Sequence, residues 1–282
     1  MSRKIIAGGC SFTLGNELSD DVDGKTPSKK SWSALLVDRM DNAAVRHDYV
    51  CSAFGGLGNP AIARRVFSAV KKYPDVQGVI VMWSFLSRYD WAMPRHQALE
   101  DTRWASISPW DTNAGNEEAF RTMQGSETQQ QHWKTRQATM QETGVRPFAE
   151  AVYKHAANEY HETYLSWKSI LWLQNILEKK RIPYMFTLAD NSLFYREMEE
   201  HRKQDSLLWA LHSELDFTKW FFFGERCMGF NQWSLLNDYK RGTTHPLDEA
   251  HQDAVKLMLP TFNKLIGDIK WNVSGDRIGG KK

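Results

Sequence analysis

Short apolar runs alternate with segments of helical periodicity along this chain, and this alternation constrains its fold more than any other feature. The apolar runs are "RKIIA", "HDYVCSAF", "GVIVMWSF" and "IPYMFTLADN". The helical segments include "SWSALLVDRM", "PAIARRVFSAVKKY", the long "FAEAVYKHAANEYHETYLSWKSILWLQNILEKK" and "DEAHQDAVKLMLPTFNKLI". Because strands that alternate with helices form βαβ units, the pattern predicts a doubly wound α/β domain of three layers, α/β/α, with a central parallel sheet.

Composition indicates one globular domain over residues 1–282. Hydrophobic residues make up 41% of the chain and charged residues 25%, which lies in the globular range. The net charge of +2 comes from mixed signs without a basic stripe, so we expect no nucleic-acid partner. No secretory leader or long apolar span is evident, which predicts a cytoplasmic protein without a membrane partner. Three cysteines without CxxC spacing argue against a disulfide framework or a structural zinc site.

The stretch of residues 87–144 interrupts the alternation. It is rich in Trp, Gln, Thr and Met and shows no clear period. Connections of this length are uncommon and are often lids or binding loops, so we expect either a lid or a partly disordered surface insertion. Tryptophans gather here, and such aromatic groups either fill a core or line a sugar or acyl pocket. The tryptophans concerned are Trp83, Trp91, Trp104, Trp110 and Trp133.

The stretch "GGCSFT" follows the first apolar run directly. Glycines permit sharp turns and close backbone approach, and ligands of open α/β sheets bind beyond the carboxyl ends of strands. Ser11 is therefore placed where chemistry often occurs, although a capping serine in a tight turn would give the same pattern. Near the other end of the chain, His245 precedes Pro246 just before the last predicted helix. A serine hydroxyl needs a neighbouring base, most often histidine, so Ser11 and His245 form a candidate pair unless His245 is a surface loop residue.

Two other motifs carry less weight. Gly24-Lys25-Thr26 resembles the end of a phosphate-binding P-loop, but Ser19 stands where that motif needs a glycine. His161 has no second histidine at helical i+4 spacing, so it does not indicate a metal site.

Together these stretches resemble the SGNH (GDSL) hydrolase family. Gly9-Cys10-Ser11 matches its first block, with Cys10 where the family often has Asp and Thr13 in the usual downstream place. The glycine of its second block is matched by Gly58 in "GGLGN", and "HPLDEAH" matches the spacing of its last block. The resemblance implies Ser11 as nucleophile, His245 as base, and the backbone N–H groups of Ser11 and Gly58 as an oxyanion hole. It does not cover residues 87–144.

Two departures from the family pattern affect the candidate site. The family's third block ends in an Asn that donates to the oxyanion, whereas here Ser84 or Arg88 would have to substitute for it. The family's acid lies three residues before the histidine, and that position is Gly242. Asp238 is our candidate for the acid, and a Ser–His dyad is the alternative. A rival register pairs Asp248 with His251.

The prediction is an esterase or O-acyl hydrolase, with a glycan ester among the candidate substrates and without metal or organic cofactor. Asn59, Trp83 and Arg88 are the expected substrate contacts. The alternative is a noncatalytic binding or structural protein on the same fold, because fold does not imply function. Short, tryptophan-rich variants of this pattern suit a phage or bacterial protein.

Overall fold

A four-stranded parallel sheet forms the centre of the computed structural model, which describes residues 3–40, 47–94, 103–113, 115, 127–194 and 206–267. The strand order is β2-β1-β3-β6, and each strand pairs in parallel with its neighbours. The strands are β1 (Arg3–Gly8), β2 (His47–Cys51), β3 (Val76–Trp83) and β6 (Tyr184–Leu188). These are the apolar runs of the sequence, so the predicted α/β fold with a central parallel sheet is confirmed.

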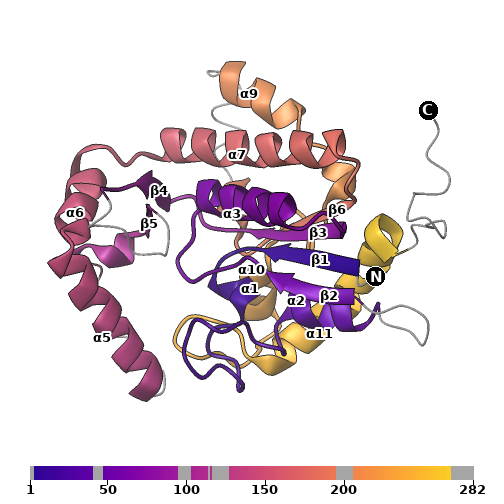
Figure 1. Ribbon diagram of the computed structural model, residues 1–282, viewed down its shortest axis with the longest axis horizontal. Coiled ribbons are helices and arrows are strands. Elements are labelled where there is room, and N and C mark those ends of the chain that lie inside the picture. The colour runs from indigo at the N-terminus through magenta and orange to yellow at the C-terminus, as the bar shows by residue number, and fades with distance from the viewer. Residues whose placement is uncertain are drawn as a thin grey trace.

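Helices cover both faces of this sheet (Figure 1). One face carries α3 (Asn59–Lys72) and α7 (Glu159–Lys179), which pack on each other. The other face carries α2 (Trp32–Asp38) and α11 (Asp248–Phe262), also packed together. The α9 helix (Ser206–Ser213) lies on the outer side of α7. Three layers result, as the alternation predicts.

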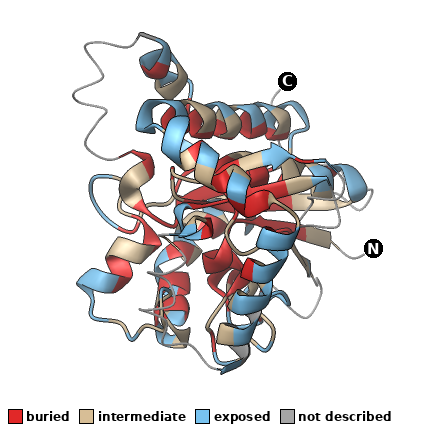
Figure 2. Ribbon diagram, turned by 90° about the vertical axis from the view of Figure 1, so that its left-hand side faces the viewer, coloured by how far each residue is buried: buried red, intermediate tan, exposed pale blue. Residues whose placement is uncertain are grey.

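Between the helix layers β1, β3 and β6 are mostly buried, whereas β2 at the edge of the sheet is only partly buried (Figure 2). Side chains of β1 and β3, including Ile5, Ile6 and Ile80, are 0% exposed. Burying one such aliphatic side chain contributes about 1.5–3 kcal/mol, so this cluster is the main source of stability. The remaining elements are α1 (Ser11–Leu14), the short helices η3 (Asn191–Leu193) and η4 (Phe217–Lys219), α10 (Phe230–Leu236) and the π-helical η5 (Asn263–Gly267).

The long helical pattern after residue 144 is two helices, α6 (Val145–His155) and α7, so the expectation of one continuous helix is wrong. The side chain of Asn158 accepts a hydrogen bond from the backbone N–H of His161 at 2.9 Å. This contact satisfies one of the unpaired N–H groups at the start of α7, which is how an N-cap fixes a helix boundary.

The described residues between 87 and 155, called the insertion below, form a small folded unit beyond the carboxyl ends of the central strands (Figure 1). Its elements are β4 (Tyr89–Ala92) paired antiparallel with β5 (Trp104–Ile107), η2 (Pro109–Asp111), α5 (Glu127–Glu142) and α6. Val145 and Val152 of α6 join Met140 of α5 in a separate apolar cluster. The unit therefore extends past residue 144 and contains regular structure that the sequence did not indicate. Most described side chains of α5 face solvent. The sequence of this helix therefore shows no continuous stripe of apolar residues at helical spacing.

In the part of the chain that the structure describes, no helix has the length and apolar character needed to cross a bilayer.

Candidate active site

Ser11 stands at the carboxyl edge of the sheet, directly beyond the central strand β1. Gly9 makes this turn possible, because it has φ of +157° and a Cβ there would lie 2.0 Å from Thr13 Oγ1. Ser11 begins the short α1 helix and is 7% exposed. The first N–H groups of a helix have no acceptor within it, so the Ser11 N–H remains available to a ligand at this edge.

His245 lies beside this serine although 234 residues separate them in sequence: its Nε2 atom is 2.7 Å from Ser11 Oγ. A hairpin presents the histidine, since the N–H of Gly242 donates to the carbonyl of His245 at 3.0 Å. The imidazole ring packs edge-on against Phe12, with ring centroids 4.7 Å apart. The structure therefore brings together the two residues that the sequence proposed as a pair.

Arg241 fastens this hairpin to α10. Its guanidinium donates to Ser234 Oγ at 3.0 Å, to Asn231 Oδ1 at 2.8 Å and to the carbonyl oxygen of Thr244. A guanidinium with three acceptors in fixed directions restrains the loop on either side of His245. The histidine is thus held by tertiary contacts rather than by its own short loop.

Glu17 supplies the carboxylate next to the far side of the imidazole. Its Oε1 atom is 3.3 Å from His245 Nδ1, and its Oε2 atom accepts hydrogen bonds from the backbone N–H groups of Thr244 and His245, each at 3.2 Å. Burial alone would raise the pKa of Glu17, but the hydrogen bond and charge of His245 and the two backbone N–H groups lower it overall. The Thr244 hydroxyl also lies 2.9 Å from Nδ1.

The structure places Asp238, our candidate acid, elsewhere. It is exposed in the turn after α10, with φ of +55°, and the ring's carboxylate neighbour is Glu17. Sequence reasoning missed Glu17 because it lies 228 residues from His245 and outside any spacing motif. The available signal was an acid six residues after the candidate nucleophile, in the loop that leaves the same strand end.

Asp248 and His251, the rival pair, have other partners. His251 is 1% exposed, and its Nδ1 atom accepts a hydrogen bond from the backbone N–H of Trp32 at 3.0 Å. Burial lowers the pKa of His251 to about 3, so the ring stays neutral and serves as an acceptor. Asp248 pairs with Lys30 at 2.8 Å. This geometry connects α11 to α2 and leaves no role for the rival register in the site.

Asn59 does not face a substrate. It is 0% exposed, its Oδ1 accepts from the N–H of Ser84 at 2.7 Å, and its Nδ2 donates to Ser166 Oγ at 3.0 Å. These bonds connect the loop after β2 to the loop after β3, on either side of Ser11. Gly58 precedes Asn59 as the N-cap of α3, and a Cβ there would lie 2.5 Å from the carbonyl oxygen of Arg88. The expected role of Asn59 in substrate binding is therefore replaced by a structural one.

Trp83 is likewise buried at 0% exposure and packs edge-on against Phe186 at 5.2 Å, so the prediction that it contacts substrate is wrong. Its indole belongs to the apolar core, where it contacts the Phe186 ring of β6. Ser84 is also buried, and its Oγ accepts a hydrogen bond from Arg88 Nη1 at 2.8 Å. The guanidinium of Arg88 lies over the Phe85 ring at 4.6 Å, and no described carboxylate pairs with it. Arg88 thus places a positive charge at the end of β3.

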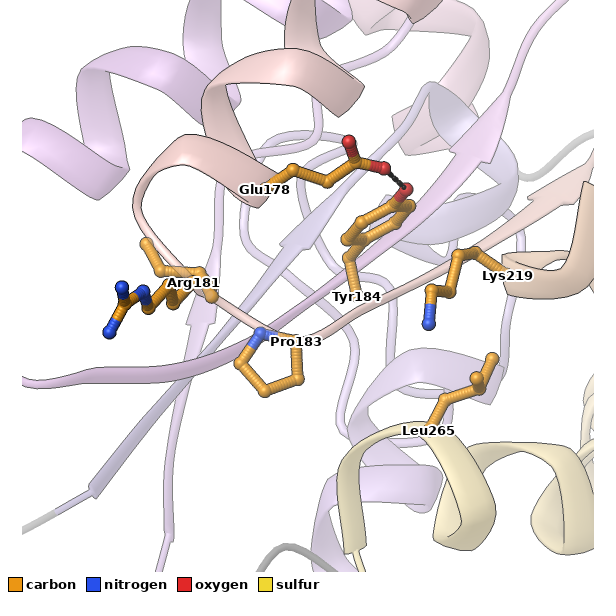
Figure 3. Close-up of a pocket in the computed structure, with 7 residues that line it drawn as sticks. Glu178, Arg181, Pro183, Tyr184, Lys219 and Leu265 are labelled. Carbon is orange, nitrogen blue, oxygen red and sulfur yellow. Dashed lines mark hydrogen bonds between the residues drawn. The ribbon is translucent and has the colours of Figure 1, made fainter. Parts of the chain in front are cut away.

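A cavity of about 230 Å³ lies at the opposite edge of the sheet (Figure 3). Tyr184, which begins β6, lines it together with Lys219 and Leu265, and the Tyr184 hydroxyl donates to Glu178 at 2.8 Å. Ser11 follows the carboxyl end of its strand, whereas this cavity opens at the amino end. It is therefore separate from the candidate site.

Nowhere in the described ranges do three or more His, Cys, Asp or Glu side chains gather as a metal site would require.

Comparison with known proteins found no matching family model and no matching curated protein. Solved structures similar to this chain include esterases and a lipolytic protein. The psychrotrophic esterase EstA from Pseudoalteromonas sp. has 10% sequence identity and a TM-score of 0.46, covering 93% of this chain and 98% of that one. The SGNH-hydrolase family esterase AlinE4 has 12% identity and a TM-score of 0.39, covering 94% and 96%. A member of the lipolytic G-D-S-L family from Veillonella parvula has 11% identity and a TM-score of 0.40, covering 94% and 98%.

Proposed function

We propose that this protein is a serine hydrolase of SGNH type that cleaves carboxylic esters. The observation that carries the proposal is the 2.7 Å contact between Ser11 Oγ and His245 Nε2 at the carboxyl edge of the sheet. A hydroxyl is a poor nucleophile at neutral pH, and a neutral imidazole nitrogen at hydrogen-bond distance is the base that activates it. The noncatalytic alternative requires that this contact have no chemical consequence.

The reaction then proceeds in two halves. Ser11 Oγ attacks the carbonyl carbon while its proton moves to His245 Nε2, and the carbonyl π electrons move to the oxygen. Collapse of this tetrahedral species breaks the bond to the alcohol, which takes the proton from Nε2 and leaves an acyl-serine. Water then attacks the acyl carbon with the same histidine as base, and the carboxylic acid and free Ser11 are regenerated.

The developing oxyanion needs donors aimed at it. We assign the backbone N–H groups of Ser11 and Gly58 to this role, because they begin α1 and α3 on adjacent sides of the β1 end. The family's Asn donor is missing, and the Arg88–Ser84 pair stands at the corresponding strand end. We propose that this pair supplies the third donor, since removing one such donor typically costs about 10²–10³ in rate.

The insertion lies beyond the same strand ends, which supports a role in substrate choice rather than in the chemistry (Figure 1). We propose that it forms a wall or lid over the acyl or alcohol group of the substrate. The ester could be of a small molecule or an O-acylated glycan.

A fluorophosphonate probe tests the proposal, because such probes phosphonylate only an activated serine. Labelling of the wild-type protein that is lost in Ser11→Ala supports it, as does measurable hydrolysis of p-nitrophenyl acetate. Absence of both labelling and hydrolysis in the folded wild-type protein would establish the noncatalytic alternative.

A further inference from the structure

We infer that Glu17 is the positioning carboxylate of this site, supplied by the loop that follows the nucleophile instead of by the loop that precedes the histidine. This inference rests on the proposed function and names the residue that orients its base. Four separate observations carry it: the contacts of the Glu17 carboxylate, the conformation of its backbone, its packing against Gly242, and the direction of its pKa shift.

The Glu17 carboxylate is held by the backbone of the segment that carries His245. Oε2 accepts from two consecutive backbone N–H groups, those of Thr244 and His245, each at 3.2 Å. This fixes the direction of the other oxygen, Oε1, which faces His245 Nδ1 at 3.3 Å. Both side chains are largely covered, with 14% of the Glu17 side chain and 12% of the His245 side chain exposed. When His245 is protonated during the reaction, a charge pair in such a place is screened less by salt than a surface pair.

The backbone of Glu17 is held in an unfavourable conformation. Its φ is +68°, in the left-handed region that residues with a Cβ seldom adopt. Asp21 stabilises this turn, because its carboxylate accepts from the N–H of Glu17 at 2.8 Å and from the N–H of Gly24 at 2.8 Å. Strained residues of this kind concentrate at functional sites.

Gly242 stands at the position where the family resemblance places the acid, and Glu17 occupies the space that a side chain there would need. A Cβ at residue 242 would lie 2.2 Å from Glu17 Oε2. A side chain at residue 242 would therefore require the Glu17 carboxylate to move. In this structure the carboxylate of one loop occupies the volume that an acid on the other would take.

The function of the carboxylate follows from the chemistry of the ring. A proton on Nδ1 that is shared with Glu17 leaves Nε2 free to accept the proton of Ser11, and the negative charge stabilises the imidazolium formed in the transition state. Because the pKa of Glu17 is lowered, the group stays ionised at neutral pH. The Thr244 hydroxyl, 2.9 Å from Nδ1 and 3.5 Å from Oε1, lies beside both groups and is a second hydrogen-bond partner of Nδ1.

The first test is Glu17→Gln, which keeps size and packing but removes the charge. We expect kcat for p-nitrophenyl acetate to fall by about 10²–10⁴ with little change in KM, as for other sites that lose the carboxylate behind the base. The downfield proton NMR signal of the imidazole Nδ1–H should be present in the wild-type protein and lost in the variant. Asp238→Asn is the matched control, since Asp238 is an exposed carboxylate that also has positive φ.

The second test moves the acid to the other loop. Glu17→Gly suits the positive φ and empties the space beside residue 242, and Gly242→Asp places a carboxylate there. Each single substitution should lower kcat, the second because its side chain collides with Glu17. The double variant should exceed both single variants, because the new Asp faces the same ring without the collision. A merely structural Glu17 predicts instead that the two losses add.

The outcomes separate this inference from the proposed function. If the wild-type protein and Asp238→Asn label with fluorophosphonate and Glu17→Gln hydrolyses the ester equally well, the site is a Ser–His dyad and the inference is overturned. An equal loss of kcat in Asp238→Asn would overturn it as well. If the wild-type protein is inert although the Nδ1–H signal depends on Glu17, the contact exists but the proposed function fails.

Discussion

The central sheet and the insertion are held together by different kinds of interaction. The sheet encloses a large apolar cluster, in which β3 is buried from Gly78 to its end at Trp83. The apolar cluster of the insertion is small, and buried polar pairs surround it: Arg64 with Asp90 at 2.9 Å, and Arg136 with Asp111 at 3.2 Å. Both aspartate side chains are nearly inaccessible, at 2% and 1% exposure. The sheet therefore provides most of the stability that holds Ser11 and His245 in place, while we expect the insertion to be the part that varies with the substrate.

This difference predicts that the residues required for ester hydrolysis lie at the edge of the central sheet and not in the insertion. Ser11→Ala and His245→Ala should each reduce ester hydrolysis to background, by comparable factors of at least about 10³, because nucleophile and base act as one unit. Steady-state kinetics with p-nitrophenyl acetate measures the losses, and circular dichroism checks that both variants remain folded. Retention of activity in His245→Ala with loss in His251→Ala would restore the rival register.

Substitutions in the two regions should also differ in how they affect stability, with global unfolding for the sheet and local unfolding for the insertion. Ile80→Ala in β3 should lower the free energy of unfolding of the whole chain by about 2–5 kcal/mol, because the side chain is 0% exposed and its loss leaves a cavity. Met140→Ala, equally buried in the insertion cluster, should increase hydrogen exchange mainly in residues 127–155. Equal destabilisation of the central strands by both variants would show that the two regions unfold as one unit.

Substrate choice should depend on the insertion. Deleting the Gln-rich stretch of residues 124–132, which lies partly outside the described residues, should change kcat/KM on long-chain or glycan esters several-fold more than on acetyl esters. The reason is that a wall beyond the strand ends contacts the variable part of the substrate and not the carbonyl. Equal losses on large and small esters would count against a lid.

The smallest effect concerns pH, where Glu17 in the site and Glu162 of α7, which contacts the insertion through Tyr89, should behave oppositely. The pKa of Glu17 in the site is lowered, so its stabilising contribution is present above the ordinary value near 4.5 and disappears as pH falls through the lowered pKa. Burial raises the pKa of Glu162, which accepts from the Tyr89 hydroxyl at 2.9 Å. Its protonated form therefore favours the folded state at low pH, and this contribution is lost as pH rises through the raised pKa.

Thermal unfolding between pH 3 and pH 7 measures the contrast. Relative to the wild-type protein, Glu17→Gln should become less stable as pH rises, whereas Glu162→Gln should become relatively more stable. Parallel pH profiles for the two variants would contradict the assignment of opposite environments.

The sequence alone determined the strands, their parallel sheet, and the two residues brought together at its edge. Each rests on a local pattern: buried strands are apolar runs, Ser11 follows a glycine turn, and His245 precedes a proline and a helix. The Asn59-Pro60 pair likewise predicts a helix start with Asn59 as N-cap, whereas in the structure the N-cap is the preceding residue, Gly58. These features are visible because hydrophobic periodicity and turn chemistry act over a few residues.

Only the tertiary structure decided which side chains surround the pair. Glu17 reaches His245 across 228 residues, and Asn59 and Trp83 turn inward to connect loops and strands rather than outward to a substrate. The α5 helix left no periodic signal because most of its described side chains face solvent. The physical reason is common to all of these: a side chain's partner is set by packing between distant segments, and a carboxylate serves equally well from any loop that can place it beside the ring.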